Sequence, residues 1–255
     1  MNLVRQWLRD AVWIIVGYFV ILEAALVAAI LYWPRFRDNT PAIAKLVPFE
    51  SLQNLMESIE ISGYWPYLAV QQWFKGCSLF GLAAAAFLAS GVVARDVDQK
   101  TIEFLLSRPV SRSRILLTRW VMVSLAVIMP AVLSSISAVW LSPLVDEQVA
   151  WTPLLVSTAF MSLFLLMLVT FTVMLSAMSS HQMRAGIILI AIILLNFALY
   201  LVQGIDELSL FKTIDVKVFM LIEAGHFPWV TAGAFLAATI AMLITAMRVF
   251  GRRDF

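Results

Sequence analysis

The chain has 255 residues, of which 62% are hydrophobic and only 13% are charged, and its mean hydropathy is +0.91. This composition excludes an ordinary soluble domain and indicates a polytopic membrane protein, which we expect to be all-α. The net charge of +2 is uninformative as a sum, and the single cysteine, Cys77, excludes an intramolecular disulfide.

Six apolar runs are long enough to form transmembrane helices, because about 20 apolar residues cross the ~30 Å hydrocarbon layer. The predicted spans are residues 11–33, 67–94, 115–141, 151–177, 185–202 and 229–250. These spans and their connections use the whole chain. We therefore predict a single transmembrane domain, residues 1–255, with no room for a second soluble domain of typical size.

The connection between the first two spans is polar and of mixed charge. Its apolar residues recur at three- and four-residue spacing, which predicts an amphipathic helix from about residue 49 to residue 59. They are Phe49, Leu52, Met56 and Ile59. We expect this helix to lie on the outer membrane surface.

Two charged residues, Glu23 and Lys75, lie within apolar spans, where each costs ~2.5–3.5 kcal/mol at the bilayer centre unless paired or hydrated. Glu23 is ten residues before Trp33, and Lys75 is nine residues after Pro66. At the helical rise both therefore lie ~13–15 Å from the outer surface. This common depth predicts an intramembrane ion pair or a shared hydrated cavity, with either a structural role or a place on a substrate path.

On the side predicted to be cytoplasmic, the longest polar interval between two spans is RDVDQKTIEFLLSRPVSRSRILLTRW, residues 95–120. Asp98 can cap a short amphipathic helix. The apolar side of that helix comprises Ile102, Leu105 and Leu106. Pro109 ends the helix, because its ring removes a hydrogen-bond donor and disfavours helix at the preceding residue. Ser111 or Ser113 can cap the helix that follows, so we predict a bend and a basic return into the membrane.

This interval resembles the segment between the second and third spans of ABC type-2 (ABC-2) transporter permeases. There, a Gly-Thr-acidic-apolar run leads to Leu-Leu-x-x-Pro-x-Ser-Arg. The matching residues are Thr101, Glu103, Leu105, Leu106, Pro109, Ser111 and Arg112, and Ser107 and Arg108 are similar. Lys100 stands where the family usually has glycine. Upstream, a more regular pair of glutamates is replaced by Arg95, Asp96 and Asp98.

The resemblance implies that residues 95–114 are a cytoplasmic coupling helix that docks into a separate ABC ATPase subunit. The implied coupling residues are Asp98, Thr101, Glu103, Leu105, Leu106, Arg108, Pro109, Ser111 and Arg112. Glu103 and Arg108 are the first choices for ATPase contacts, because charges at the ends of an apolar docking face fix its register. An idle helix on the membrane explains the apolar side equally well, but not the run through Pro109 and Arg112.

The distribution of basic residues predicts the orientation, because Lys and Arg near span ends are retained on the cytoplasmic side. With both termini in the cytoplasm, twelve of the eighteen basic residues lie inside. They are Arg5, Arg9, Arg95, Lys100, Arg108, Arg112, Arg114, Arg119, Arg184, Arg248, Arg252 and Arg253. Ten of the sixteen acidic residues fall outside. We therefore predict a multi-pass protein of the cytoplasmic (inner) membrane.

Several kinds of chemistry have no motif in this chain. No G-x-x-x-x-G-K-[ST] phosphate-binding motif occurs, so any ATP is hydrolysed by another polypeptide. His181 and His226 are far apart, so we expect no metal site, and we assign no catalytic residue. The basic residues line membrane ends instead of forming one face, which gives no support for nucleic-acid binding.

The sequence therefore predicts the permease subunit of an ATP-binding cassette exporter of an unidentified substrate. No cofactor is expected in this chain, because the resemblance implies ATP and magnesium in the partner subunit. It also implies a second permease, identical or similar, within the lipid bilayer. The alternatives are a secondary transporter that uses Glu23 and Lys75, or a non-transporting membrane assembly factor. Secondary carriers often show repeated halves, and no clear internal repeat is present.

Overall fold

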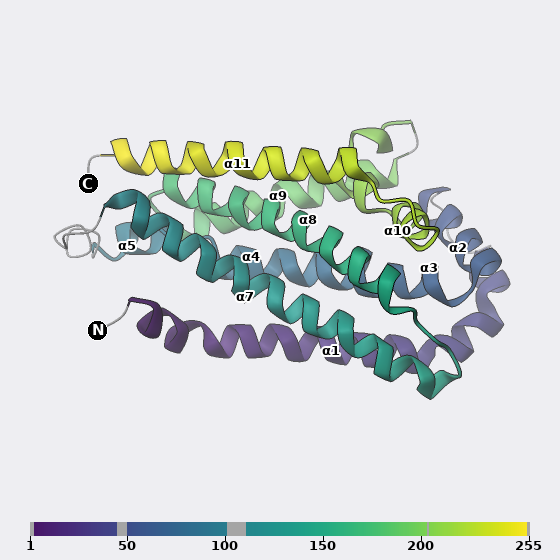
Figure 1. The fold of residues 1–255 in the computed structure, drawn as a ribbon. Coiled ribbons are helices and arrows are strands. Elements are labelled where there is room, and N and C mark those ends of the chain that lie inside the picture. Colours follow the sequence, from purple (N-terminus) through teal and green to yellow (C-terminus); the bar gives the residue numbers. More distant parts are fainter. Residues whose placement is uncertain (1–2, 45–49, 101–110, 203, 254–255) are drawn as a thin grey trace.

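The computed structural model describes residues 3–44, 50–100, 111–202 and 204–253, which form a bundle of long helices (Figure 1). The described residues contain no β-strand. Both termini lie at one end of the bundle, and the short helix α2 lies at the other (Figure 1). The prediction of an all-α, polytopic membrane protein is confirmed.

Five of the described helices are long and apolar enough to cross a membrane. They lie in α1 (Leu3–Ala44), α7 (Arg112–Leu141, continued by η2, Ser142–Val145), α8 (Trp151–Met178), α9 (Gln182–Leu201) and α11 (Trp229–Arg252). They correspond to five of the six predicted spans. The sixth, residues 67–94, remains a prediction as a membrane span.

The region of the second predicted span is helical from Tyr64, but it is not one regular helix. It comprises α3 (Tyr64–Ala69), the π-helical segment η1 (Val70–Phe80) and α4 (Gly81–Leu88). The expected helical end near residue 94 is wrong, because turns follow Leu88 before α5 (Ala94–Asp98) begins. Gly76 suits the wider π turn, since a Cβ there would lie 2.8 Å from the Gln71 carbonyl oxygen.

The first helix also extends beyond its expected end at Trp33. It continues through Pro34 to Ala44, because the aromatic side chains that flank the proline pack on the start of α3. The ring centroids of Trp33 and Phe36 lie 4.8 and 4.9 Å from that of Tyr67. Burial of these rings favours a continued helix over the break that proline alone predicts.

Helix α2 (Glu50–Ser62) confirms a helix in the first connection, where residues 49–59 were expected to form one. It lies at the end of the bundle opposite the termini (Figure 1). Gly63, whose φ of 76° is in the left-handed region that favours glycine, turns the chain from α2 into α3. The position of α2 on the outer membrane surface remains a prediction.

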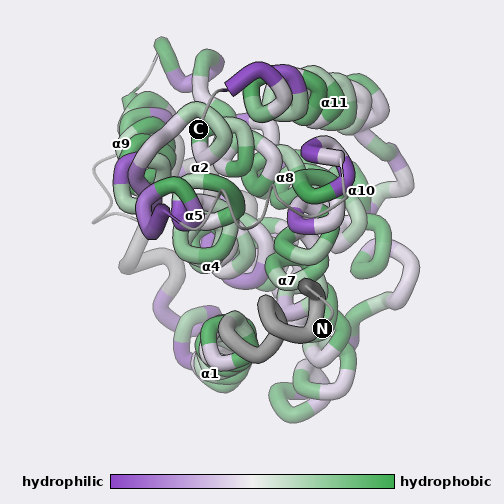
Figure 2. Tube along the Cα trace, turned by 90° about the vertical axis from the view of Figure 1, so that its left-hand side faces the viewer, coloured by the Kyte–Doolittle hydropathy of each residue, from purple (hydrophilic) through white to green (hydrophobic). Residues whose placement is uncertain are grey.

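The centre of the bundle is α8, which α4, α7, α9 and α11 surround, with α1 at one edge (Figure 2). Phe160 and Phe164 on α8 are fully buried, and their rings lie 5.7 and 5.6 Å from that of Phe235 on α11. Such interlocking aromatic side chains fix how the two helices pack.

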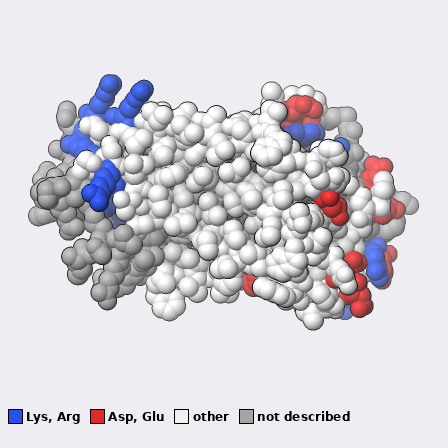
Figure 3. Space-filling model, viewed as in Figure 1, with Lys and Arg blue, Asp and Glu red and all other residues white. Residues whose placement is uncertain are grey.

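Charged side chains gather at the two ends of the bundle (Figure 3). Basic residues mark the end with the termini, whereas acidic residues predominate at the other end (Figure 3). Between them the surface exposes large apolar side chains, including Trp13, Phe87 and Leu194 at 80, 68 and 61%. A lipid-facing surface requires such a band.

The connection from α9 to α11 is folded at the acidic end. It contains η3 (Asp206–Leu208), η4 (Leu210–Ile214) and α10 (Val216–Glu223). Lys212 donates a hydrogen bond to Asp206, and this contact lowers the pKa of the Asp206 carboxyl.

Candidate functional site at the basic end

The structure describes the two ends of the predicted coupling segment, residues 95–100 and 111–114. Six of the predicted coupling residues lie outside the described residues: Thr101, Glu103, Leu105, Leu106, Arg108 and Pro109. The other three, Asp98, Ser111 and Arg112, are described. The site is therefore built from α5, which leads into the segment, and from the start of α7, which leaves it.

The start of α5 is attached to α8 through one hydroxyl group. Ser176 Oγ on α8 accepts hydrogen bonds from the backbone N–H groups of Val93 and Ala94, both at 3.0 Å. It donates its own proton to the Ser90 carbonyl oxygen at 2.7 Å. Ser176 is fully buried, so these bonds satisfy backbone groups that water does not reach. Nothing in the sequence distinguished Ser176 from other small residues of an apolar span.

A second attachment joins α5 to α7 through Arg119. Its guanidinium forms an ion pair with Asp96 and also donates to the Val92 carbonyl oxygen. Both charged side chains are about four-fifths buried, at 20 and 21% exposure, so solvent screens the pair less than an ion pair on an open surface. The sequence placed Arg119 among the basic residues near cytoplasmic span ends, and the structure directs its side chain to α5.

The end of α5 contacts the start of α9. Asp98 Oδ1 lies 2.8 Å from His181 Nδ1, and His181 is the N-cap residue of α9. Both side chains are substantially exposed. The helix that Asp98 was expected to cap lies outside the described residues, and the described contact of its carboxylate is with His181.

The start of α7 reaches the C-terminal end of α11. Ser111 is the N-cap of α7, because its Oγ accepts from the Arg114 backbone N–H at 3.3 Å, and this confirms one of the two predicted caps. Arg112 Nη1 donates to the backbone oxygens of Phe250 and Arg253, at 3.3 and 2.7 Å. A cation is favourable there, since the last carbonyls of a helix lack intrahelical partners.

Arg253 continues this connection from α11 to α8. Its Nη1 donates to the carbonyl oxygens of Ala177 and Ser179, at 2.9 and 2.8 Å, and its Nη2 donates to Ser180 Oγ at 3.0 Å. The guanidinium thus satisfies carbonyls at the C-terminal end of α8. The sequence placed Arg112 and Arg253 at the same membrane face but did not predict their backbone partners.

The backbone conformation of Lys100 suits glycine, the residue that is usual at this position in the segment that residues 95–120 resemble. Its φ is 56°, in the left-handed region where a side chain is disfavoured and glycine is not. The chain therefore turns at Lys100 immediately after α5. The departure from the family pattern changes the residue but keeps a conformation that suits glycine.

The predicted intramembrane pair is not formed between Glu23 and Lys75, both of which the structure describes. Lys75 is exposed, and its Nζ lies 3.4 Å from Gln71 Oε1 on the same helical segment. Glu23 Oε2 is buried without a hydrogen-bond partner. The prediction of an ion pair between Glu23 and Lys75 is therefore wrong. A hydrated cavity shared by the two side chains remains a prediction.

A buried polar contact between η1 and α7 was not predicted from the sequence. Gln72 is 1% exposed, and its amide donates to Ser134 Oγ at 3.3 Å and Ser135 Oγ at 3.0 Å on α7. These bonds link η1 to α7 and compensate for burial of the Gln72 amide.

Comparison with known proteins places this arrangement in a family. Residues 4–255 match a family model described as ABC-2 family transporter protein. No curated protein matches the chain. The family match includes α5, the start of α7 and the helices that both contact.

The left-handed turn at Lys100 gives a first prediction. Lys100→Gly should stabilise the purified protein by about 0.5–1 kcal/mol, because glycine removes the cost of a left-handed Cβ. Lys100→Val should destabilise it, since a β-branched residue is poorly tolerated there. Thermal unfolding in detergent compares the three proteins. A melting temperature for Lys100→Gly below that of Lys100→Val contradicts the assigned conformation.

The Arg253 contacts give a second prediction. Arg253→Gln should accelerate amide exchange at the C-terminal ends of α8 and α11 about tenfold, because charge-assisted hydrogen bonds of ~1.5–3 kcal/mol are lost. Hydrogen–deuterium exchange with mass spectrometry measures this change. Arg252→Gln is the matched control, since Arg252 is exposed. Equal exchange in the two variants contradicts the role of Arg253.

Proposed function

The chain belongs to the ABC-2 transporter family, and we propose that it is the membrane-spanning permease subunit of an ATP-binding cassette exporter. In this proposal, a separate ATPase subunit binds ATP and magnesium and carries out hydrolysis. This chain supplies the transmembrane path and contributes no catalytic residue. The observation that carries the proposal is the attachment of α5 and the start of α7 to the long helices of the bundle.

These attachments suit a mechanical role for residues 95–114. Ser176 joins α5 to α8, Asp98 joins it to His181, and Arg112 joins α7 to the end of α11. A force applied to the segment between α5 and α7 would therefore reach several membrane helices. Coupling of this kind requires two rigid-body states whose balance a distant ligand changes.

The charge distribution supports a cytoplasmic position for this segment. The end of the bundle that carries the termini is basic and the opposite end is largely acidic (Figure 3). Because basic residues are retained on the cytoplasmic side, we assign both termini and the coupling segment to the cytoplasm. An ATPase that uses cytoplasmic ATP would then meet residues 101–110.

A second permease subunit, identical or similar, completes the proposed transporter. One chain then engages one ATPase, and the transport path opens between the two permeases. A secondary transporter that depends on a Glu23–Lys75 ion pair is not favoured, because these two described residues do not pair. We therefore propose ATP hydrolysis in the partner subunit as the energy source.

The ATPase partner gives the third prediction. The full chain, purified in mild detergent from its native membrane, should retain a Walker-motif protein with measurable ATPase activity. A Leu105→Asp, Leu106→Asp double variant should lose most of this partner, at least ~tenfold, because burying two unpaired carboxylates at the docking face is costly.

Arg248→Gln provides the control, because Arg248 is exposed at the same end of the bundle but outside the coupling segment. Its partner recovery should equal that of the parent chain. Recovery of no ATPase, or equal recovery with the double variant, contradicts the proposal.

A further inference from the structure

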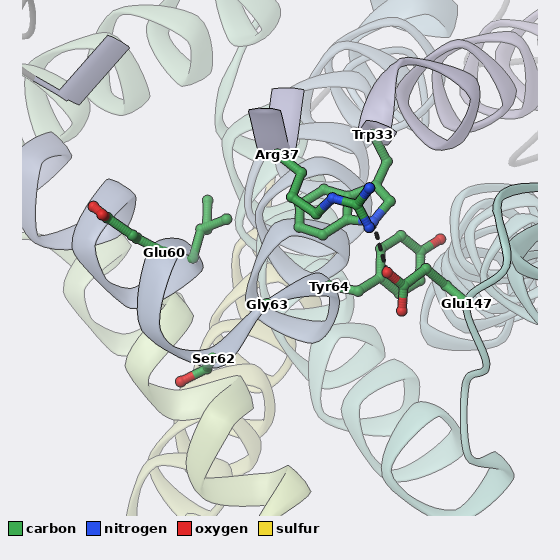
Figure 4. A pocket seen from close by; sticks show the side chains of 8 residues that line it. Trp33, Arg37, Glu60, Ser62, Gly63, Tyr64 and Glu147 are labelled. Atoms are coloured by element: carbon green, nitrogen blue, oxygen red, sulfur yellow. Dashed lines mark hydrogen bonds between the residues drawn. The ribbon is translucent and has the colours of Figure 1, made fainter. Parts of the chain in front are cut away.

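A cavity of about 400 Å³ is lined in part by α2, which lies at the end of the bundle opposite the termini (Figure 1 and Figure 4). It is formed where the end of α1, the turn between α2 and α3, and the connection between α7 and α8 meet. Six of its lining residues are Trp33, Arg37, Glu60, Ser62, Tyr64 and Glu147. Its volume is near the lower limit of small-molecule sites, ~300–1,000 Å³, and suits a compact polar group.

Trp33 and Tyr64 fix one wall of this cavity. Trp33 is 2% exposed, and its indole Nε1 donates to Glu147 Oε1 at 2.8 Å. The Tyr64 hydroxyl is 2.7 Å from Ser142 Oγ. The Trp33 bond holds the Glu147 carboxylate at the cavity, beside the rings of Trp33 and Tyr64 (Figure 4). No described residue donates to its second oxygen, Oε2.

The lining of the cavity carries one basic and two acidic side chains, those of Arg37, Glu60 and Glu147. Arg37 lies with Trp33, Tyr64 and Glu147, whereas the side chains of Glu60 and Ser62 point away from this group (Figure 4). Arg37 and Glu147 are both described and form no ion pair. The described ionic contact of Arg37 is with its exposed neighbour Asp38, at 3.5 Å, and such surface pairs are weak.

This arrangement matches the charges of a small zwitterion. The free oxygen of Glu147 can accept from an ammonium group, and the Arg37 guanidinium can donate to a phosphate. The rings of Trp33 and Tyr64 favour a cation beside them. The Glu147 carboxylate would repel a purely anionic ligand, and a purely cationic ligand would make no favourable contact with the Arg37 guanidinium.

The cavity also lies where a lipid headgroup would be found. Trp33 and Tyr64 belong to an aromatic cluster, with ring centroids 5.3 Å apart, at the end of an apolar span. Trp and Tyr concentrate at the membrane–water interface. We propose that this cavity binds a zwitterionic group that carries an ammonium and a phosphate, supplied by a bilayer phospholipid or by a soluble phosphoethanolamine compound. The proposal is independent of the ATPase partnership.

Calorimetric titration of the purified full chain with glycerophosphoethanolamine tests the shared chemistry. Glycerophosphoglycerol, a phosphodiester of the same phosphate charge that lacks the ammonium group, should bind about tenfold more weakly, because one charge-assisted hydrogen bond is lost. Native mass spectrometry with phosphatidylethanolamine and phosphatidylglycerol tests the lipid source. Preferential retention of phosphatidylethanolamine identifies the bilayer as the source, whereas binding of the soluble probe alone identifies a soluble ligand.

Two variants test the assigned residues. Glu147→Gln keeps an acceptor for Trp33 but removes the charge, and Arg37→Gln removes the opposite charge from an exposed position. Each should weaken binding about tenfold, while Glu207→Gln, an exposed change at the same end, should not. The proposal is overturned if neither probe class binds, if the ammonium group makes no difference, or if both pocket variants bind as the parent does.

Discussion

One buried hydroxyl group fixes the place where α5 leaves the bundle. The helical path through η1 and α4 ends at Leu88, and the turn that follows leaves backbone groups without helical partners. Ser176 serves three of these groups, on Ser90, Val93 and Ala94. Without it, two buried N–H groups would be unsatisfied, at a cost of about 1–3 kcal/mol each. The direction in which α5 leaves the bundle therefore depends on a side chain from α8.

The remaining contacts at this end extend the same constraint to other helices. Arg119 fixes α5 against α7, while Arg112 and Arg253 connect α7, α11 and α8 through helix-terminal carbonyls. These partners are mostly backbone atoms, which rigid helices hold in place. The opposite end has a different chemistry, with an aromatic cluster around Trp33 and a cavity lined by Arg37 and Glu147, which do not pair with each other. The two ends of the bundle therefore differ in chemistry, with arginine contacts to helix-terminal carbonyls at one end and an aromatic cluster beside a cavity at the other.

The sequence predicted features that depend on composition and local chemistry. Apolar runs located five membrane-length helices, and hydroxyl capping identified Ser111, because both follow from residues close in sequence. Tertiary packing carried α1 beyond Pro34, and the π turn near Gly76 broke the regular second span. Contacts such as Ser176 with Ala94 join positions 82 residues apart, so no local pattern reveals them. The common depth of Glu23 and Lys75 in the membrane did not predict whether they pair, because depth does not specify which way a side chain faces.

In the proposed transporter, α5 moves as one body with α8 when the partner ATPase binds nucleotide, because Ser176 attaches one to the other. Spin labels at Gln99→Cys and Met178→Cys, both exposed positions, measure this relation in the assembled transporter by electron paramagnetic resonance. Cys77 is buried, so it competes little for the label. We expect this distance to stay constant with ATP, while the distance between the Gln99→Cys labels of the two permeases changes. A change between α5 and α8, or a fixed distance between the permeases, would contradict this proposal.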